Sequence, residues 1–344
     1  RSRMELSNQY TWDTSASSAF SQRIRGYIEA SKDYEISSAL DKARKVMPLD
    51  KMKDSASKRV DEYRKSKAGL ELEAGDKAEH LCYHASLTRE LLTWFRDEKF
   101  FCWFNKPSCW SCDHGDMCMQ GMAPPTPEEL RWKGHRVELY ACPSCHATTR
   151  FPRYNAAEKL LDTRKGRCGE WANCFTLCAR AAGLDARMCY DFTDHVWTEV
   201  WSPTLNRWIH ADSCEASLDE PLLYSEGWGK KLTYIVAVCP LGATDVTPRY
   251  VKYWNSDILS RRTQIPEGSI LLELEALSHQ YFDRDTASSV QKSIYLSQRY
   301  YDQKSLLERM RNQDGKTPES TSLPGRSSGS EEWIKSRGED GGGK

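Results

Sequence analysis

The sequence has no long apolar run and no excess of charge of one sign. No stretch approaches the roughly 18–20 apolar residues that a membrane-spanning helix requires, so we expect no membrane span. Lys plus Arg and Asp plus Glu number 49 each, which gives a formal net charge of zero. A neutral chain argues against a nucleic-acid binder that depends on a large basic surface, although a local basic patch stays open.

The chain also lacks the even number of cysteines that complete disulfide pairing requires. The chain of 344 residues has 13 cysteines, so complete pairing in intramolecular disulfides is excluded. No signal peptide is recognisable, and two cysteine pairs have C-x-x-C spacing. These observations favour a reducing compartment, in which some thiols bind metal or do chemistry. The opening residues Arg1-Ser2-Arg3-Met4 lead us to expect that the chain is part of a longer one.

Composition divides the chain into three parts. Residues 1–85 predict an N-terminal helical region that is partly disordered, because its first 20 residues are polar and rich in serine. Residues 86–311 predict a core, and within it residues 102–150, rich in Cys, Pro and Gly, predict a small inserted module. Residues 312–344 are poor in large apolar residues and end in Gly-Gly-Gly-Lys, which is typical of a flexible linker to an absent C-terminal region.

The core has both hydrophobic periods, which predicts an α+β fold. Apolar residues at helical spacing predict helices over 86–101, 168–182 and 267–311. Period-two alternation predicts strands over 186–192, 195–201, 208–214 and 232–240. Cys174 and Cys178 lie on the apolar stripe of the second helix, and we expect both to be buried structural cysteines.

Two C-x-x-C pairs stand 29 residues apart in the inserted module. Two such pairs can place four thiolates around one tetrahedral metal ion, and Zn²⁺ suits sulfur ligands best. A redox dithiol would explain one pair but not both. Because a closed site of four sulfurs has no open position for water, we predict a structural role for the metal. His114 and Cys118 are weaker alternative ligands. The predicted zinc ligands are Cys109, Cys112, Cys142 and Cys145.

A second constellation predicts nucleophilic chemistry. Cys168 begins a predicted helix, where the helix dipole and free amide groups favour a thiolate. Such a nucleophile needs a base and a group that orients the base. If the turn between the two middle strands centres on Thr204, His195 lies within one residue of facing Asp212. The pattern therefore predicts a Cys-His-Asp triad. His210, two residues before Asp212 on the same strand, is expected to be structural.

This order of Cys, His and Asp, on a helix followed by two strands, resembles the transglutaminase-like superfamily. Within it, the flanking segments are similar to the cytoplasmic peptide:N-glycanase family, and the similarity covers residues 86–311. The resemblance implies a transglutaminase-like (papain-like) cysteine-amidase core with an inserted four-cysteine zinc module and flanking helices. The matching segments are residues 151–155, 166–175, 194–200, 221–224 and 227–232.

The resemblance also implies a function and site residues. It implies an amidase that cuts the bond between an Asn side chain and the first sugar of an N-linked glycan, leaving Asp. Cys168 would be the nucleophile, His195 the general base and acid, and Asp212 the orienting carboxylate. Glu215 matches a position that contacts substrate in the family. The expected setting is the cytosolic degradation of misfolded glycoproteins, preferably unfolded ones, with proteasome-shuttle proteins as partners.

Other functions use the same residue types. A transglutaminase would pass the acyl group of Gln to an amine, and a papain-like protease would cut the main chain. The glycanase-like flanking motifs separate these from the amidase. A non-catalytic binding module of the same fold would lack the catalytic cysteine. The aromatic residues near the predicted triad could stack on sugars or simply pack the sheet; they are Tyr190, Trp197, Trp201, Trp208 and Trp228.

Overall fold

A computed structural model describes residues 14–67, 76–285, 287–311 and 323–341 of the chain. The disorder expected at the N-terminus falls on residues 1–13, which lie outside the described residues. The same holds for 312–322 and 342–344, which belong to the expected linker.

Helices make up most of the described chain. In chain order they are α1 (Thr14–Ser31), η1 (Lys32–Glu35), α2 (Ser37–Val46), α3 (Leu49–Ser66), α4 (Ala78–Leu81), α5 (Tyr83–Leu92), η2 (Thr93–Asp97), α6 (Pro127–Arg131), α7 (Ala157–Thr163), α8 (Cys168–Ala181), η3 (Leu223–Gly227), η4 (Thr247–Arg249), α9 (Ser256–Ser260), α10 (Glu267–Arg284), α11 (Ser289–Arg311) and α12 (Glu331–Ser336).

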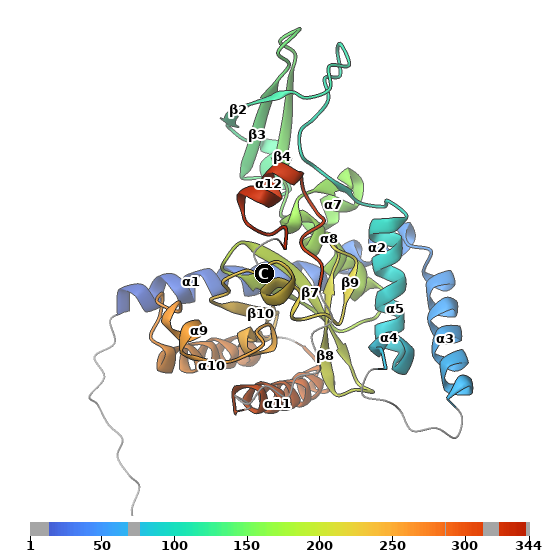
Figure 1. The fold of residues 1–344 in the computed structure, drawn as a ribbon, viewed down its shortest axis with the longest axis vertical. Helices are drawn as coiled ribbons and strands as arrows, with labels where there is room; N and C mark the ends of the chain where they lie inside the picture. Colours follow the sequence, from blue (N-terminus) through green and yellow to red (C-terminus); the bar gives the residue numbers. More distant parts are fainter. Residues whose placement is uncertain (1–13, 68–75, 286, 312–322, 342–344) are drawn as a thin grey trace, which may run out of the picture.

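The strands form three sheets. They are β1 (Cys102–Trp103), β2 (Cys118–Ala123), β3 (Arg136–Ala141), β4 (Thr148–Arg153), β5 (Lys165–Gly166), β6 (Ala186–Asp191), β7 (His195–Ser202), β8 (Arg207–Asp212), β9 (Ser217–Leu218), β10 (Ile235–Cys239) and β11 (Gly242–Asp245). The central six-stranded sheet has the order β11-β10-β6-β7-β8-β9 and is antiparallel throughout. The antiparallel sheet β2-β3-β4 stands away from it at one end (Figure 1).

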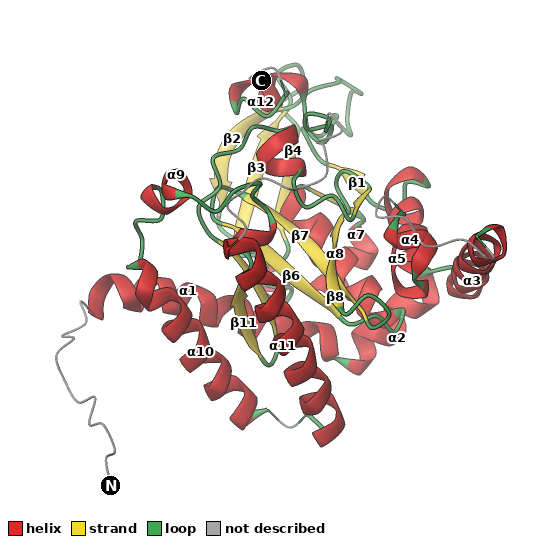
Figure 2. Ribbon diagram, turned by 60° about the horizontal axis from the view of Figure 1, so that its bottom comes forward, coloured by secondary structure: helices red, strands yellow, loops and turns green. Residues whose placement is uncertain are grey.

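Both faces of the central sheet are covered. On one face α8 packs against β6 and β7, and the Thr176 hydroxyl on α8 lies 2.8 Å from the Thr198 hydroxyl on β7. On the other face α11 crosses β8, whereas α10 packs along the edge strand β11, where the Ser278 hydroxyl bonds to the Ala243 backbone; Figure 2 shows both helices beside the sheet. The strands are consequently buried almost along their full length, so the predicted alternation of buried and exposed residues gives way to two apolar faces.

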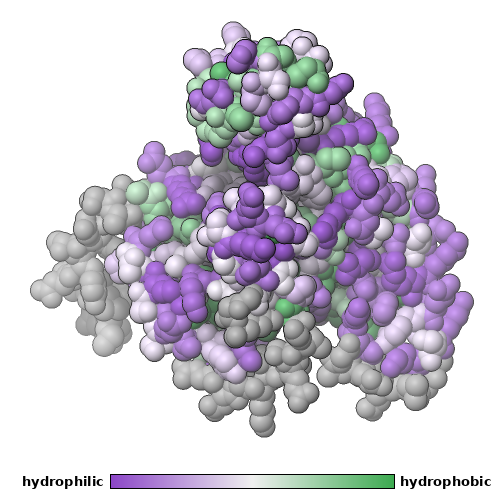
Figure 3. All heavy atoms as spheres, turned by 45° about the horizontal axis from the view of Figure 1, so that its top comes forward, coloured by the Kyte–Doolittle hydropathy of each residue, from purple (hydrophilic) through white to green (hydrophobic). Residues whose placement is uncertain are grey.

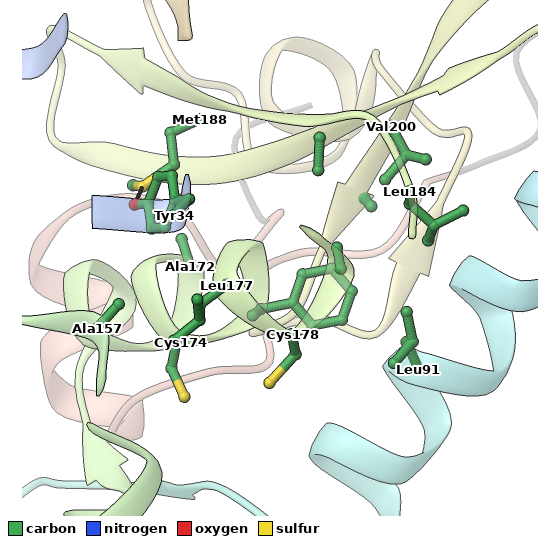
Figure 4. Packing of buried hydrophobic residues seen from close by; sticks show 14 of the residues in the cluster. Tyr34, Leu91, Ala157, Ala172, Cys174, Leu177, Cys178, Leu184, Met188 and Val200 are labelled. Atoms are coloured by element: carbon green, nitrogen blue, oxygen red, sulfur yellow. Dashed lines mark hydrogen bonds between the residues drawn. The ribbon is translucent and has the colours of Figure 1, made fainter. Parts of the chain in front are cut away.

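The helix α8 forms the centre of the larger core. Its apolar residues meet Leu184 and Val200 on the side of the sheet, as Figure 4 shows. Cys174 and Cys178 are fully buried on this helix, as expected from its apolar stripe. The helix ends at Ala181, and Gly183, with φ of +90°, closes a C-terminal turn in which the Leu184 N–H donates to the Ala179 carbonyl at 3.1 Å.

Two parts of the chain differ from the sequence-based expectations. The helix expected over 267–311 is interrupted at Asp285, which is extended with ψ 140°, so α10 and α11 fold back on one another. Residues 323–341 are folded against the core instead of forming a linker, and they include the short helix α12. Their contacts are mostly ionic and aromatic, which is why a search for apolar periodicity passes over them.

The described residues on the face seen in Figure 3 are mainly hydrophilic, with apolar side chains gathered chiefly on the lobe that projects toward the viewer. Met119 and Met122 on β2 are among the exposed apolar residues. In the described ranges, no helix combines the length and the apolar character needed to cross a bilayer.

A buried ionic network fixes α11 to the central sheet. Arg187 donates to Glu199 at 2.7 Å and to Asp302 of α11 at 2.8 Å, and Arg249 pairs with both carboxylates. All four side chains are at most 8% exposed. Burial opposes ionisation of Glu199, but the two arginines outweigh it and lower its pKa to about 2. The stabilisation from this carboxylate is therefore present above its unfolded pKa of about 4.3 and is lost as the pH falls toward about 2.

Asp302→Asn is expected to lower the free energy of unfolding by about 3–5 kcal/mol, because it leaves two buried guanidinium groups with one carboxylate. Urea denaturation measures this change. The matched control is Asp257→Asn, which removes a carboxylate that is 70% exposed and pairs with Arg261 one turn away. Little change is expected there. Equal stability of the two variants would contradict a structural role for the network.

Candidate active site and metal centre

The predicted nucleophile stands at the first residue of α8. Cys168 is half-buried, and the residue before it, Arg167, is held from two sides. The Arg167 N–H donates to the Glu170 carboxylate at 2.9 Å, and its guanidinium makes two bonds of 2.7 Å to Glu138 on β3. The projecting sheet and the helix start are thereby joined directly beside the thiol.

The predicted base and its orienting group meet on neighbouring strands. His195 begins β7, and its Nε2 lies 2.8 Å from Oδ2 of Asp212 at the end of β8. The pairing of Trp201 with Trp208 makes the register one residue different from the one expected. Continued along the strands, it places Asp212 opposite Trp197, two residues from His195. Asp212 and His195 therefore share a face of the sheet and meet as a diagonal pair.

The electrostatic environment of the triad favours the charged forms of Cys168, His195 and Asp212. Burial disfavours the imidazolium of His195, but the charge and hydrogen bond of Asp212 and the contact with Cys168 raise its pKa. Burial likewise opposes the Cys168 thiolate, but the hydrogen bond and charge of His195 lower the thiol pKa. The pKa of Asp212 is held well below its usual range by His195 against the effect of burial. Nδ1 of His195 is buried without an N or O partner among the described residues, so it is the nitrogen left for the thiol.

A second buried chain of hydrogen bonds supports Asp212. The Tyr224 hydroxyl donates to Asp212 Oδ2 at 2.9 Å, and His210 Nε2 lies 2.7 Å from the same hydroxyl. The backbone N–H of Cys214 donates to the other carboxylate oxygen at 2.8 Å. His210 therefore has the supporting place expected of it. Sequence reasoning missed the role of Tyr224, although this residue ends one of the segments that carried the family resemblance.

Glu215 follows Asp212 by three residues, and its carboxylate already accepts hydrogen bonds from other residues of the chain. Its carboxylate accepts from the Ser327 N–H at 2.9 Å, from the Ser327 hydroxyl at 2.6 Å and from the Ser328 N–H at 3.0 Å. These partners belong to the folded C-terminal residues, and no pattern in the sequence pointed to them. Whether Glu215 contacts substrate stays a prediction.

The aromatic residues near the triad mainly pack the protein interior. Trp197 and Trp228 are 0% and 1% exposed, and Trp201 and Trp208 are also buried. Trp228 packs with its ring centroid 5.0 Å from that of His195. Tyr190 stacks on Tyr27 at 3.7 Å. Of these residues, Trp197 and Trp228 pack against the His195 ring, and the others pack elsewhere in the protein interior.

The four predicted metal ligands come together in the projecting module. Their sulfur atoms all lie within 4.8 Å of one another, with Cys109 and Cys145 3.5 Å apart and Cys112 and Cys142 3.6 Å apart. A tetrahedral ion with metal–sulfur bonds of about 2.3 Å requires sulfur separations of about 3.8 Å, so the set could hold one metal ion. Backbone N–H groups of Cys145 and Ser144 help lower the pKa of Cys142 to about 6, whereas, against a backbone hydrogen bond at His114, the neighbouring thiols raise the pKa of Cys112 to about 12.

The weaker alternative ligands stay outside this cluster. Nδ1 of His114 lies 3.3 Å from the Ser144 hydroxyl, and Cys118 is exposed at the start of β2. The module has its own small core, which is formed by Phe104, Cys109, Met117, Tyr140, Cys142 and Phe151.

Alkylation should single out Cys168. Because its pKa is lowered, the thiolate fraction rises with pH earlier than in an ordinary thiol, whose pKa is about 8.5. We expect the midpoint of iodoacetamide labelling, followed by peptide mass spectrometry, to lie below that of exposed Cys102 in the same samples. Cys239, whose pKa burial raises, should react last of the three. A midpoint for Cys168 above that of Cys102 would contradict an activated thiol.

Comparisons with known proteins agree with this geometry. A family model described as the transglutaminase-like superfamily matches residues 119–213, and one described as the Rad4 transglutaminase-like domain matches residues 192–284. A solved structure of Rad4–Rad23 crosslinked to an undamaged DNA has a TM-score of 0.53 and 12% sequence identity, and it covers 90% of this chain and 60% of that chain. That likeness concerns the fold alone. The expected α+β, transglutaminase-like fold is thus confirmed.

The curated relatives share one name, peptide-N(4)-(N-acetyl-beta-glucosaminyl)asparagine amidase. The Arabidopsis thaliana protein is 41% identical over 94% of this chain and 42% of its own length. The human protein is 38% identical over 95% of this chain and 47% of its own length. The protein of Yarrowia lipolytica is 35% identical over 90% of this chain and 81% of its own length.

The chain spans less than half the length of the plant and human relatives, but it spans most of the yeast one. The matched regions cover 90–95% of this chain, at 35–41% identity. The chain belongs to the family of peptide-N(4)-(N-acetyl-beta-glucosaminyl)asparagine amidases.

Proposed function

We propose that this chain hydrolyses the β-aspartylglucosaminyl amide bond of N-linked glycoproteins, releasing the glycan and converting the linked Asn to Asp. The observation that carries the proposal is the meeting of an activated thiol, an imidazole and a buried carboxylate, in a chain of this family. Because the longer relatives extend well beyond the matched region, the activity, substrates and partners of the whole protein are part of the proposal.

In the first step the Cys168 thiolate attacks the carbonyl carbon of the glycosylated Asn side chain. The resulting oxyanion lies near the N-terminus of α8, where the Cys168 N–H is a suitable donor. Since Nε2 of His195 is engaged by Asp212, the proton for the leaving group comes from Nδ1. The carbon–nitrogen bond breaks, the glycosylamine leaves with that proton, and a thioester stays on Cys168.

In the second step the same imidazole acts as a base. Nδ1 of His195 takes a proton from water as the water attacks the thioester carbonyl. The carbon–sulfur bond breaks, the Cys168 thiolate is restored, and the substrate side chain leaves as Asp. Asp212 holds the imidazole in place and stabilises its charged form throughout.

The four-cysteine cluster would hold one Zn²⁺ ion by Cys109, Cys112, Cys142 and Cys145. The all-sulfur donor set and the sulfur separations support zinc, which supplies a structural crosslink there. The reaction steps involve this chain's own side chains, and the metal acts by holding the projecting sheet together.

For substrate, we propose N-glycosylated and preferably unfolded proteins, with Glu215 as a substrate contact. Its carboxylate would have to exchange partners with the folded C-terminal residues to do so. A cytoplasmic role in the degradation of misfolded glycoproteins, with proteasome-shuttle proteins as partners, is part of the same proposal.

Incubation with a denatured N-glycoprotein tests the reaction. We expect free glycan together with a peptide in which the former glycosylation site carries Asp, about one mass unit heavier than Asn because an amide has become an acid. Cys168→Ala, in the same incubation, should release none. Retained glycan together with covalent incorporation of an added amine would instead indicate acyl transfer of the transglutaminase kind.

A further inference from the structure

The folded C-terminal residues 323–341, here called the C-terminal strap, lie across the site. The Arg326 N–H donates to the Glu339 carbonyl at 2.8 Å, so the two ends of the strap run side by side. A Cβ on Gly325 would stand 2.3 Å from the Asp340 carbonyl oxygen, and one on Gly227 would stand 2.5 Å from the Pro324 oxygen. Figure 1 shows α12 of the strap between the projecting sheet and β7. The strap is therefore closely fitted both to itself and to the core.

The strap forms hydrogen bonds and an ion pair with residues that adjoin His195 and Asp212 in the sequence. Ser327 and Ser328 bond to Glu215, which follows Asp212 by three residues. Arg337 donates to the Asp194 carboxylate at 2.7 Å and to its carbonyl at 3.2 Å, directly before His195. Closing of the strap thus fixes the two strand ends that carry the imidazole and its carboxylate.

Arg326 is the strap residue that enters the site. Its guanidinium lies 4.7 Å from the ring centroid of Trp228 and 4.3 Å from that of Trp333. The Trp228 ring in turn packs against His195. The side chain of Arg326 is 0% exposed, although it carries a full charge. A buried cation among these aromatic rings interacts strongly with the other charges of the site, because little water screens it.

The pairing of Arg326 is incomplete. Its Nη1 donates to Glu339 at 2.7 Å and its Nε to the Ser328 carbonyl at 3.1 Å. Nη2 is buried and has no hydrogen-bond partner in the described part of the chain. Glu339 is itself shared with Arg337 at 3.0 Å and with Lys230 at 3.9 Å. Arg337 also pairs with Asp194 at 2.7 Å and Lys230 with Asp191 at 2.6 Å, so Arg326 is the cation that depends on Glu339 alone and keeps an unbonded Nη2.

We propose that Arg326 is a positioning residue of the active site, brought there by the C-terminal strap, whose incompletely paired guanidinium favours the thiolate of Cys168 over the thiol. The proposal rests on the proposed function of Cys168 as the nucleophile. The strap would then be part of the working site, so that a protein without a seated strap has the triad but a less reactive sulfur.

Other charged groups near Cys168 act in both directions. The imidazole of His195 favours the thiolate and so does Arg326, whereas Asp194 opposes it. The adjoining thiol of Cys214 has its pKa raised well above the ordinary value by burial and by the nearby negative charge of Asp212 and Cys168. Arg326 thus adds a second cation to the single imidazole in a site that also holds carboxylates.

The pH dependence of alkylation tests this role separately from turnover. Arg326→Gln should raise the pH midpoint of Cys168 labelling by iodoacetamide by about 0.5–1 unit, because a nearby cation is lost. Arg326→Lys keeps the positive charge, so its midpoint should stay close to that of the native protein. The matched control is Lys335→Gln, which removes an equal charge from the exposed surface of α12. It should label like the native protein.

A native midpoint in folded Arg326→Gln would overturn the proposal. If that variant does not fold, Gly325→Ala provides a second route, since its Cβ would push the strap ends apart while Arg326 is retained. If limited proteolysis cuts the strap of Gly325→Ala while the Cys168 midpoint stays native, the proposal would also be overturned. If Arg326→Gln shifts the midpoint of Cys168 but the native protein releases no glycan, the proposed function is refuted and the electrostatic role of Arg326 is kept.

Discussion

Asp212→Asn is expected to lower kcat for glycan release about 10⁴-fold, which corresponds to about 5.5 kcal/mol of transition-state stabilisation. Asp212 is fully buried and accepts hydrogen bonds from His195, Tyr224 and the Cys214 N–H. An amide in its place loses the charge that raises the pKa of His195, and its NH₂ group faces donors. The imidazolium that protonates the leaving group is then destabilised, and the neutral ring can adopt the wrong tautomer. Initial rates of glycan release measure the effect.

Tyr224→Phe is the graded comparison for this prediction. It keeps the Asp212 carboxylate but removes one of its donors, and it leaves His210 Nε2 without the hydroxyl. One hydrogen bond of this kind contributes about 1–1.5 kcal/mol, so we expect a loss of about tenfold. If Asp212→Asn kept more activity than Tyr224→Phe, the carboxylate would not be the orienting group of a triad.

Cys142→Ser is expected to remove the bound metal and to unfold the projecting module. Structural zinc sites contribute about 10–16 kcal/mol of apparent binding free energy near neutral pH, and the core of this module is only a few side chains. We expect metal analysis to give one zinc per native chain and none in the variant. Circular dichroism should show an early melting step in the variant alone.

Loss of the metal should also lower turnover, although the cluster is remote from the reacting atoms. Glu138 on β3 binds the Arg167 guanidinium, and Cys142 directly follows the end of the same strand. When that strand loosens, the residue before Cys168 loses its anchor. The matched control is Cys118→Ser, an exposed thiol on β2 outside the cluster, which should retain metal and activity. One zinc ion and native melting in Cys142→Ser would refute the predicted ligand set.

Much of the fold could be derived from local patterns. The helix that begins at Cys168 and the strands that carry His195 and Asp212 follow from hydrophobic period, and the structure places their ends within a few residues of the expected ones. The hairpin register was one residue different because the centre of its turn had to be assumed. The error did not separate His195 from Asp212, since side chains two residues apart share a face.

Contacts between distant parts of the chain could not be derived in this way. The bonds of Ser327 to Glu215 and of Arg187 to Asp302 join residues more than 110 positions apart. Polar side chains that pair in the interior look, in sequence, the same as polar side chains that face water. For that reason the sequence predicts a linker where the structure has the strap, and it does not predict the ionic attachment of α11 to the sheet.

The chemistry available to this protein can be predicted from its sequence: a thiol at a helix start, an imidazole and a carboxylate on adjacent strands, and four cysteines spaced for one metal ion. These depend on residue type and short spacing, which local geometry fixes. The charges around the thiol and the segment that covers it become visible only in the folded chain. The environment of Cys168 depends on burial and on charges such as Arg326, brought together by packing from remote segments, and the free energy of such charges is set by distance in space.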